Sequence, residues 1–185
     1  MERMIDSLAR YSRLKLLLIF FLIIEISIRT GEYLIYFIDP VSHENSLGSQ
    51  SYVIEYFFSQ PLILSLFLFN VVGPLIETLI FQVLILLTIK KLTEWILKSD
   101  SWLPALVMAT LAFAAVHGLE YTNWYYWTIN ASIRLPISFV LALAAVVEYN
   151  KENGRPILVV FFCMPCITPS NPFFYSLRLH NPAKI

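Results

Sequence analysis

A glutamate and a histidine in apolar surroundings are the residues of this chain best suited to chemistry. Glu77 lies in a long apolar run, three residues after Pro74, and His117 lies at the end of a second apolar run. An ionisable group in hydrocarbon costs about 2.5–3.5 kcal/mol on insertion scales, so such groups mark functional positions. A carboxylate and an imidazole that meet in a hydrated pocket can share general-base and oxyanion-stabilising work.

Helix geometry predicts that these two side chains lie at a similar depth. Counted back from Ile89, Glu77 lies about 18 Å from the end of its segment at the usual helical rise. Counted forward from Leu103, His117 lies about 21 Å from the same face by the same rise. The spacing fits a catalytic pair and equally a structural pair in which each side chain satisfies the other, so both interpretations stay open here.

The Gly73-Pro74 pair predicts a break in the helix that carries Glu77, because proline lacks the N–H that continues a helix. Irregular backbone at membrane depth survives only where protein or water satisfies the freed carbonyl groups. A carboxylate beside such a break therefore indicates a hydrated pocket within the bilayer.

Two motifs around these residues resemble those of a known family. Residues 74–77 (Pro-Leu-Ile-Glu) followed by Phe81, and then residues 113–117 (Phe-Ala-Ala-Val-His), are similar to motifs of the CAAX protease and bacteriocin-processing family, also called the Abi family. Its members are intramembrane peptidases with a Glu-Glu-x-x-x-Arg motif, a Phe-x-x-x-His motif and a last His-x-x-x-Asn or Asp motif. The resemblance covers roughly residues 60–175 in helix order and motif spacing.

The resemblance implies an endopeptidase in which a glutamate-activated water attacks a peptide bond near the membrane. Its catalytic residues would be Glu77, His117 and Asn171. The substrate would be a membrane-associated peptide or a membrane protein, and the resemblance leaves open whether a divalent metal takes part.

The chain departs from the family pattern at several motif positions. Thr78 stands where the second glutamate is expected, and Gln82 stands where the arginine is expected. Losing both members of an ion pair leaves no lone buried charge, so these two changes can compensate each other. If Asn171 is the asparagine of the last motif, Ile167 occupies the position of its histidine. These departures leave an alternative, a catalytically inactive relative that acts as a membrane immunity or binding protein.

A further alternative rests on the two cysteines, Cys163 and Cys166, which have the spacing of a redox dithiol or of half a zinc site. A zinc site needs two more ligands, and none is clustered nearby in the sequence. Small, buried and inert cysteines account for the pair more simply than a redox membrane protein does.

The elements that must position these residues are apolar helices. The chain has 185 residues, of which 58% are hydrophobic, well above the usual share of about 45–50% in globular proteins. Membrane-spanning helices are predicted over 14–36, 61–89, 103–119, 131–149 and, more weakly, from residue 156. The sequence predicts an all-α, multi-pass transmembrane bundle of about five to six spans in a single domain, residues 1–185, with one span broken at Gly73-Pro74.

The distribution of lysine and arginine predicts the orientation of these spans. Basic residues precede the first span and follow the second and the fourth, whereas residues 39–60 and 120–130 contain none. The positive-inside rule then predicts a protein of the cell membrane whose N-terminus lies in the cytoplasm. The first predicted partner is the lipid bilayer. Thirteen basic and thirteen acidic residues give a net charge of zero, which argues against a nucleic-acid partner.

Overall fold

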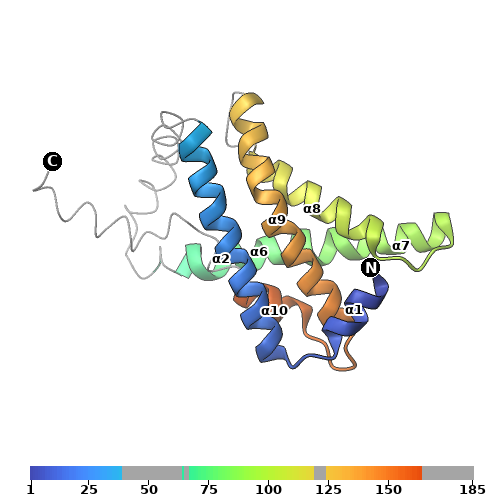
Figure 1. Ribbon diagram of the computed structural model, residues 1–185. Coiled ribbons are helices and arrows are strands. Elements are labelled where there is room, and N and C mark those ends of the chain that lie inside the picture. Colours follow the sequence, from blue (N-terminus) through green and yellow to red (C-terminus); the bar gives the residue numbers. More distant parts are fainter. Residues whose placement is uncertain (39–63, 65–66, 119–123, 164–185) are drawn as a thin grey trace, which may run out of the picture.

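The computed structural model describes residues 1–38, 64, 67–118 and 124–163, and these residues form helices joined by short turns, with no strand among them (Figure 1). The prediction of an all-α fold is confirmed for this part of the chain. The elements in chain order are α1 (Glu2–Ala9), α2 (Arg13–Ile38), η1 (Leu68–Val72), α6 (Gly73–Glu77), η2 (Thr78–Ile85), α7 (Leu86–Leu97), α8 (Leu103–Gly118), α9 (Trp124–Tyr149) and α10 (Pro156–Cys163).

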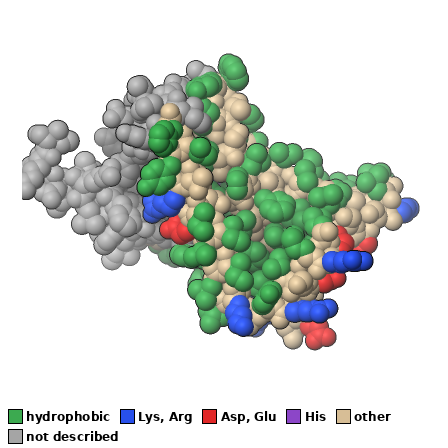
Figure 2. All heavy atoms as spheres, in the orientation of Figure 1, with side chains coloured by type: hydrophobic (Ala, Val, Ile, Leu, Met, Phe, Trp, Pro, Cys, Tyr) green, Lys and Arg blue, Asp and Glu red, His purple; other side chains and the backbone are tan. Residues whose placement is uncertain are grey.

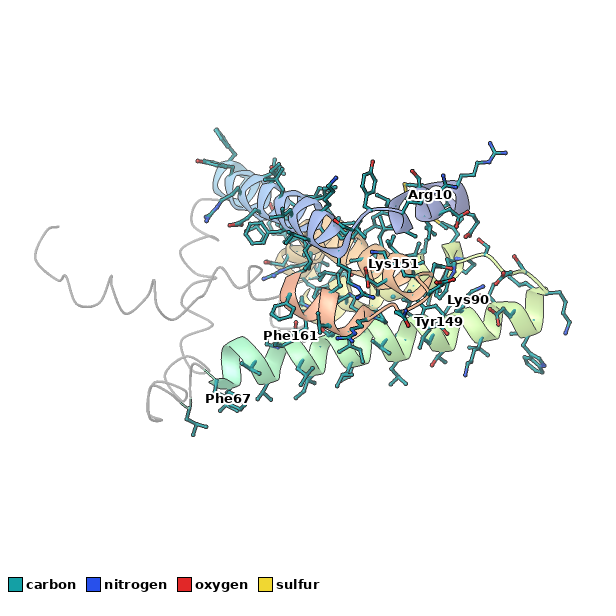
Figure 3. The ribbon with its side chains drawn as sticks, turned by 90° about the horizontal axis from the view of Figure 1, so that it is seen from below. Arg10, Phe67, Lys90, Tyr149, Lys151 and Phe161 are labelled. Carbon is teal, nitrogen blue, oxygen red and sulfur yellow. The ribbon has the colours of Figure 1, made fainter. Side chains whose placement is uncertain are left out.

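Four of these elements, η1, α6, η2 and α7, follow one another without a loop and form one helix, called the long helix below. Figure 3 shows it unbroken from Phe67 past Lys90. Counted as one helix, it brings the described part of the chain to six helices.

The predicted break at Gly73-Pro74 was wrong, because the chain stays helical through both residues. Gly73 has φ −56° and ψ −60°, and its N–H donates to the carbonyl oxygen of Leu68, five residues earlier. This wider π-helical spacing occurs on both sides of α6. A proline ring clashes with the carbonyl four residues before it in a regular α-helix, and a widened turn relieves that clash without ending the helix.

Helix α9 lies at the centre of the fold. Helices α2, α8 and α10 each pack against it, and the long helix packs against α8 and α10. The run from Val140 to Glu148 is buried on every side. In Figure 1 the long helix lies across α2 and α9, so the rise along it does not measure depth along those two helices.

One helical segment among the described residues, Trp127–Tyr149, is long and apolar enough to cross a bilayer. Half of its most apolar stretch is buried inside the molecule. Core helices of soluble proteins pass the same test of length and composition, so this segment is weak evidence for a membrane span. Helix α2 is as long and carries Lys15, Glu25 and Arg29 among its apolar residues. The coarse prediction, a helical bundle, therefore holds for the described residues.

Three segments rich in basic residues meet at one end of the fold. Arg13, the first residue of α2, donates from Nε to Glu148 Oε2 over 3.0 Å. After α7, the backbone N–H of Trp102 donates to Glu2 Oε1 over 3.2 Å, and its ring stacks edge-on with Tyr149 at 5.3 Å between centroids. The N-terminus, the turn after α7 and the turn after α9 thus lie together at one end of the fold.

Candidate functional site

The structure brings Glu77 and His117 together from two helices. Glu77 is the last residue of α6, and His117 lies in the last turn of α8. Their closest atoms, Glu77 Oε2 and His117 Nε2, are 3.7 Å apart, with side-chain exposures of 38% and 17%. This distance suits an ion pair and is longer than a direct hydrogen bond, so a small rotation of either side chain would close it. The predicted juxtaposition of the two residues is confirmed.

The orientation of the imidazole follows from its other nitrogen. His117 Nδ1 lies 2.9 Å from the carbonyl oxygen of Phe113, which can only accept a hydrogen bond, so Nδ1 carries a proton. In the neutral ring, Nε2 then presents a lone pair toward the carboxylate of Glu77. Two lone pairs repel each other, so the arrangement is favourable when one proton lies between Nε2 and Oε2.

Aromatic packing holds the histidine ring in place. Phe113 is buried and stacks on His117 with ring centroids 4.2 Å apart and planes 28° apart. Phe81 from η2 meets the same Phe113 ring edge-on at 5.5 Å. The indole N–H of Trp127 in α9 donates to the carbonyl oxygen of Ala115 over 3.2 Å, which ties the last turn of α8 to α9. Phe81 and Phe113 thus connect the helix of Glu77 to the helix of His117.

Two polar side chains within five residues after Glu77 are buried inside the fold. Thr78 is 0% exposed and Gln82 is 1% exposed. Neither Thr78 Oγ1 nor the amide nitrogen and oxygen of Gln82 has a hydrogen-bond partner among the described residues. The positions where the motif expects a glutamate and an arginine therefore carry neutral polar groups in the interior, and no charge is stranded there.

The third predicted catalytic residue, Asn171, lies outside the described residues, as do Ile167 and Cys166. Cys163 is buried at the end of α10. Among residues 1–38, 67–118 and 124–163, no group of three or more His, Cys, Asp or Glu side chains could hold a metal ion.

One buried carboxylate, Glu148, was not predicted from the sequence. Glu148 in α9 is fully buried and accepts hydrogen bonds from Arg13 Nε at 3.0 Å, Lys151 Nζ at 2.5 Å and the backbone N–H of Arg155 at 3.2 Å. The chain closes tightly around it, because a Cβ on Gly154 would lie 1.6 Å from the carbonyl oxygen of Glu148. Its one sequence signal was Lys151, three residues later. The contacts tie α2, α9 and the start of α10 together.

Another missed residue is Thr110 in α8, whose buried hydroxyl also has no hydrogen-bond partner among the described residues. A threonine within an apolar helix gives no signal in the sequence, because its hydroxyl usually bonds to a carbonyl of its own helix.

Comparison with protein-family models, with curated proteins and with solved structures found no match for this chain. The chemistry of Glu77, His117 and their neighbours is therefore the basis for assigning a function.

Proposed function

We propose that this protein is an intramembrane endopeptidase in which Glu77 activates a water molecule and His117 assists it. The observation that carries the proposal is the 3.7 Å approach of Glu77 Oε2 to His117 Nε2. Both residues belong to motifs that resemble those of the CAAX protease and bacteriocin-processing family, and they come from separate helices. A second support is the stacked Phe113, the first residue of the Phe-x-x-x-His motif, which holds the ring.

The proposed reaction gives the two side chains different roles. The Glu77 carboxylate takes a proton from a water molecule as the water oxygen attacks the carbonyl carbon of the scissile peptide. His117, protonated at Nε2, donates a hydrogen bond to the oxygen that becomes negative, which stabilises the tetrahedral intermediate. When the C–N bond breaks, the proton on Glu77 passes to the leaving amine. The resemblance gives Asn171 a supporting role beside the histidine.

The bilayer as the site of this reaction is supported by the outer surface of α2. Leu14, Leu18, Leu22 and Ile26 recur every four residues and are 58–68% exposed. They form a continuous apolar stripe, and hydrophobic side chains cover much of the face seen in Figure 2. Apolar surface of this extent marks contact with a membrane or a partner. We therefore place α2 and α9 across a cell membrane, with the basic end of the fold in the cytoplasm.

A cleavage assay tests the proposed activity. The full chain in lipid nanodiscs is incubated with a panel of membrane-proximal peptides, and products are identified by mass spectrometry. Glu77→Gln is expected to lower the rate by about 10²-fold or more, the usual size of a general-base contribution. Glu25→Gln, which changes a glutamate of α2 away from the pair, is the matched control and is expected to cleave at the wild-type rate.

Equal rates for wild type and Glu77→Gln would contradict the proposal, as would the absence of cleavage by either. The absence of cleavage would instead favour the alternative of a membrane immunity or binding protein. That alternative expects a protective phenotype that survives both Glu77→Gln and His117→Ala.

A further inference from the structure

Two polar side chains that follow Glu77 have no hydrogen-bond partner in the described part of the chain. Thr78 and Gln82 follow Glu77 on one face of η2, four residues apart, and both are buried. Their hydroxyl and amide atoms lack hydrogen-bond partners among the described residues. An amide side chain can donate two hydrogen bonds and accept two, so Gln82 alone presents several unmet sites.

Leaving such groups unpaired is unfavourable. A buried polar atom without a partner costs about 1–3 kcal/mol, and native proteins rarely keep one. The buried neighbours on the same helix, Phe81 and Leu86, are apolar and offer no side-chain partner. Thr93, further along the same helix, shows the ordinary solution, because its hydroxyl bonds to the carbonyl of Ile89 at 2.8 Å. Thr78 does not use that solution.

The backbone at this place is also unusual. Thr78–Ile85 is π-helical, and π-helical turns are rare and occur frequently at functional sites. Glu77 directly precedes this stretch and is 38% exposed on its side chain. A partly exposed carboxylate thus adjoins a widened helical turn that carries two unmatched polar groups.

We infer that Thr78 and Gln82 bind ordered water beside Glu77 and so form an internal hydration site. A buried water typically makes about three hydrogen bonds, and the Gln82 amide with the Thr78 hydroxyl supplies both donors and acceptors for them. The hydration site needs no peptidase activity. Its catalytic consequence rests on the proposed function: water held here replaces the molecule that each hydrolysis consumes at Glu77.

Nuclear magnetic resonance on the full chain in nanodiscs tests the hydration site without any substrate. The sequence has only three glutamines, at positions 50, 60 and 82, so labelling glutamine with ¹⁵N gives three side-chain amides. Gln82→Met assigns the Gln82 signal by removing it. We expect a nuclear Overhauser cross-peak between water and the Gln82 amide protons. In a second sample, labelled with ¹⁵N at every residue, we expect none between water and the backbone N–H of Leu86.

Thr78→Val is expected to abolish or weaken the Gln82–water cross-peak, because it removes one partner of the bound water. Thr93→Val, a matched change at a threonine whose hydroxyl is already bonded, is expected to leave it unchanged. A Gln82 amide without a water cross-peak in the folded wild-type protein overturns the inference, whether or not the protein cleaves peptides. A cross-peak that responds to Thr78→Val upholds it even if no peptide is cleaved.

Discussion

At the scale of single residues, the geometry of the site depends on the aromatic rings that orient His117. The Phe113 carbonyl fixes the proton on Nδ1 of His117, and the Phe113 ring stacks on the imidazole. The position of Nε2 opposite Glu77 therefore depends on a residue that cannot take part in the chemistry. The motif resemblance pointed to Phe113, but only the structure assigns it this packing role.

Phe113→Ala is expected to affect stability and activity together. Deleting a fully buried ring typically costs about 3–5 kcal/mol of unfolding free energy, and here it also frees the imidazole to rotate. Phe113→Leu refills most of the volume, so it is expected to recover most of the stability but not the cleavage rate. Thermal unfolding and peptide cleavage of both variants check this. A Phe113→Leu variant that cleaves at the wild-type rate would show that the ring does not orient His117.

The Lys90–Asp100 pair gives a pH dependence whose sign can be worked out. Burial alone would lower the pKa of Lys90, but hydrogen bonds and charge attraction from Asp100 and Glu94 raise it. The hydrogen bond and charge of Lys90 lower the pKa of Asp100 below its ordinary value of 3.8. The pair therefore adds stability at neutral pH, which is lost as pH falls through the lowered pKa of Asp100 or rises through the raised pKa of Lys90.

Asp100→Asn is accordingly expected to lower the melting temperature slightly at neutral pH and to have no effect well below pH 3.8. The effect is small because Asp100 is exposed to solvent, where ion pairs are screened. Melting curves of wild type and variant across this pH range measure it, with Glu152→Gln in another turn as the control. A difference between wild type and Asp100→Asn that persists at low pH would rule out the carboxylate as its cause.

At the scale of helices, the sequence predicted the apolar segments well and the local geometry less well. The apolar runs around Glu77 and His117 became helices because apolar side chains recur along them with little polar interruption. The Gly73-Pro74 pair misled the prediction, since π-helical turns accommodate the proline without a break. A proline in a sequence does not show by itself whether the helix ends there or accommodates the ring with a widened turn.

The contacts of Glu148 with Arg13, Lys151 and the backbone N–H of Arg155, called the clamp below, could not be predicted from the sequence for a different reason. Its partner Arg13 is far away along the chain, and no local spacing links the two residues. The conformation of the turn after α9 closes the clamp, and that turn depends on a glycine at position 154.

Gly154→Ala is expected to destabilise the protein severely. A Cβ there would lie 1.6 Å from the backbone oxygen of Glu148, so the turn must move away and the clamp must open. Gly73→Ala is the matched control, because its Cβ would meet its nearest atom at 3.5 Å, an ordinary contact. Alanine in a helix is favoured over glycine by roughly 0.5–1 kcal/mol, so Gly73→Ala should raise the melting temperature. Similar melting temperatures for the two variants would contradict this account of the turn.

At the scale of the whole molecule, charge and packing agree on which ends of the helices belong together. The lysine and arginine pattern predicted that the N-terminus and the turns after α7 and α9 share one side. The contacts of Glu2 with Trp102 and of Arg13 with Glu148 bring these three segments together. The sequence could predict this grouping because charge, unlike packing detail, is visible without coordinates. The predicted role of Asn171 stays a prediction.

The prediction that the N-terminus and the turns after α7 and α9 share one side of the membrane can be tested by cysteine labelling. Single cysteines at Glu2, Asp100 and Glu152, in a chain with Cys163 and Cys166 replaced by serine, are expected to show the same accessibility to a membrane-impermeant thiol reagent. In intact cells all three should be protected, and in inside-out vesicles all three should react. Labelling of one position in intact cells while another stays protected would contradict the proposed arrangement of the helices in the membrane.

The most direct test of the central claim is a double-mutant cycle on the cleavage rate. If Glu77 and His117 share one proton in one reaction, they act as a unit and their effects are not additive. Glu77→Gln, His117→Ala and the double variant should then all cleave at nearly the same low rate, far below wild type. A double variant slower than either single variant by the product of their separate effects would show two independent residues and contradict the claim.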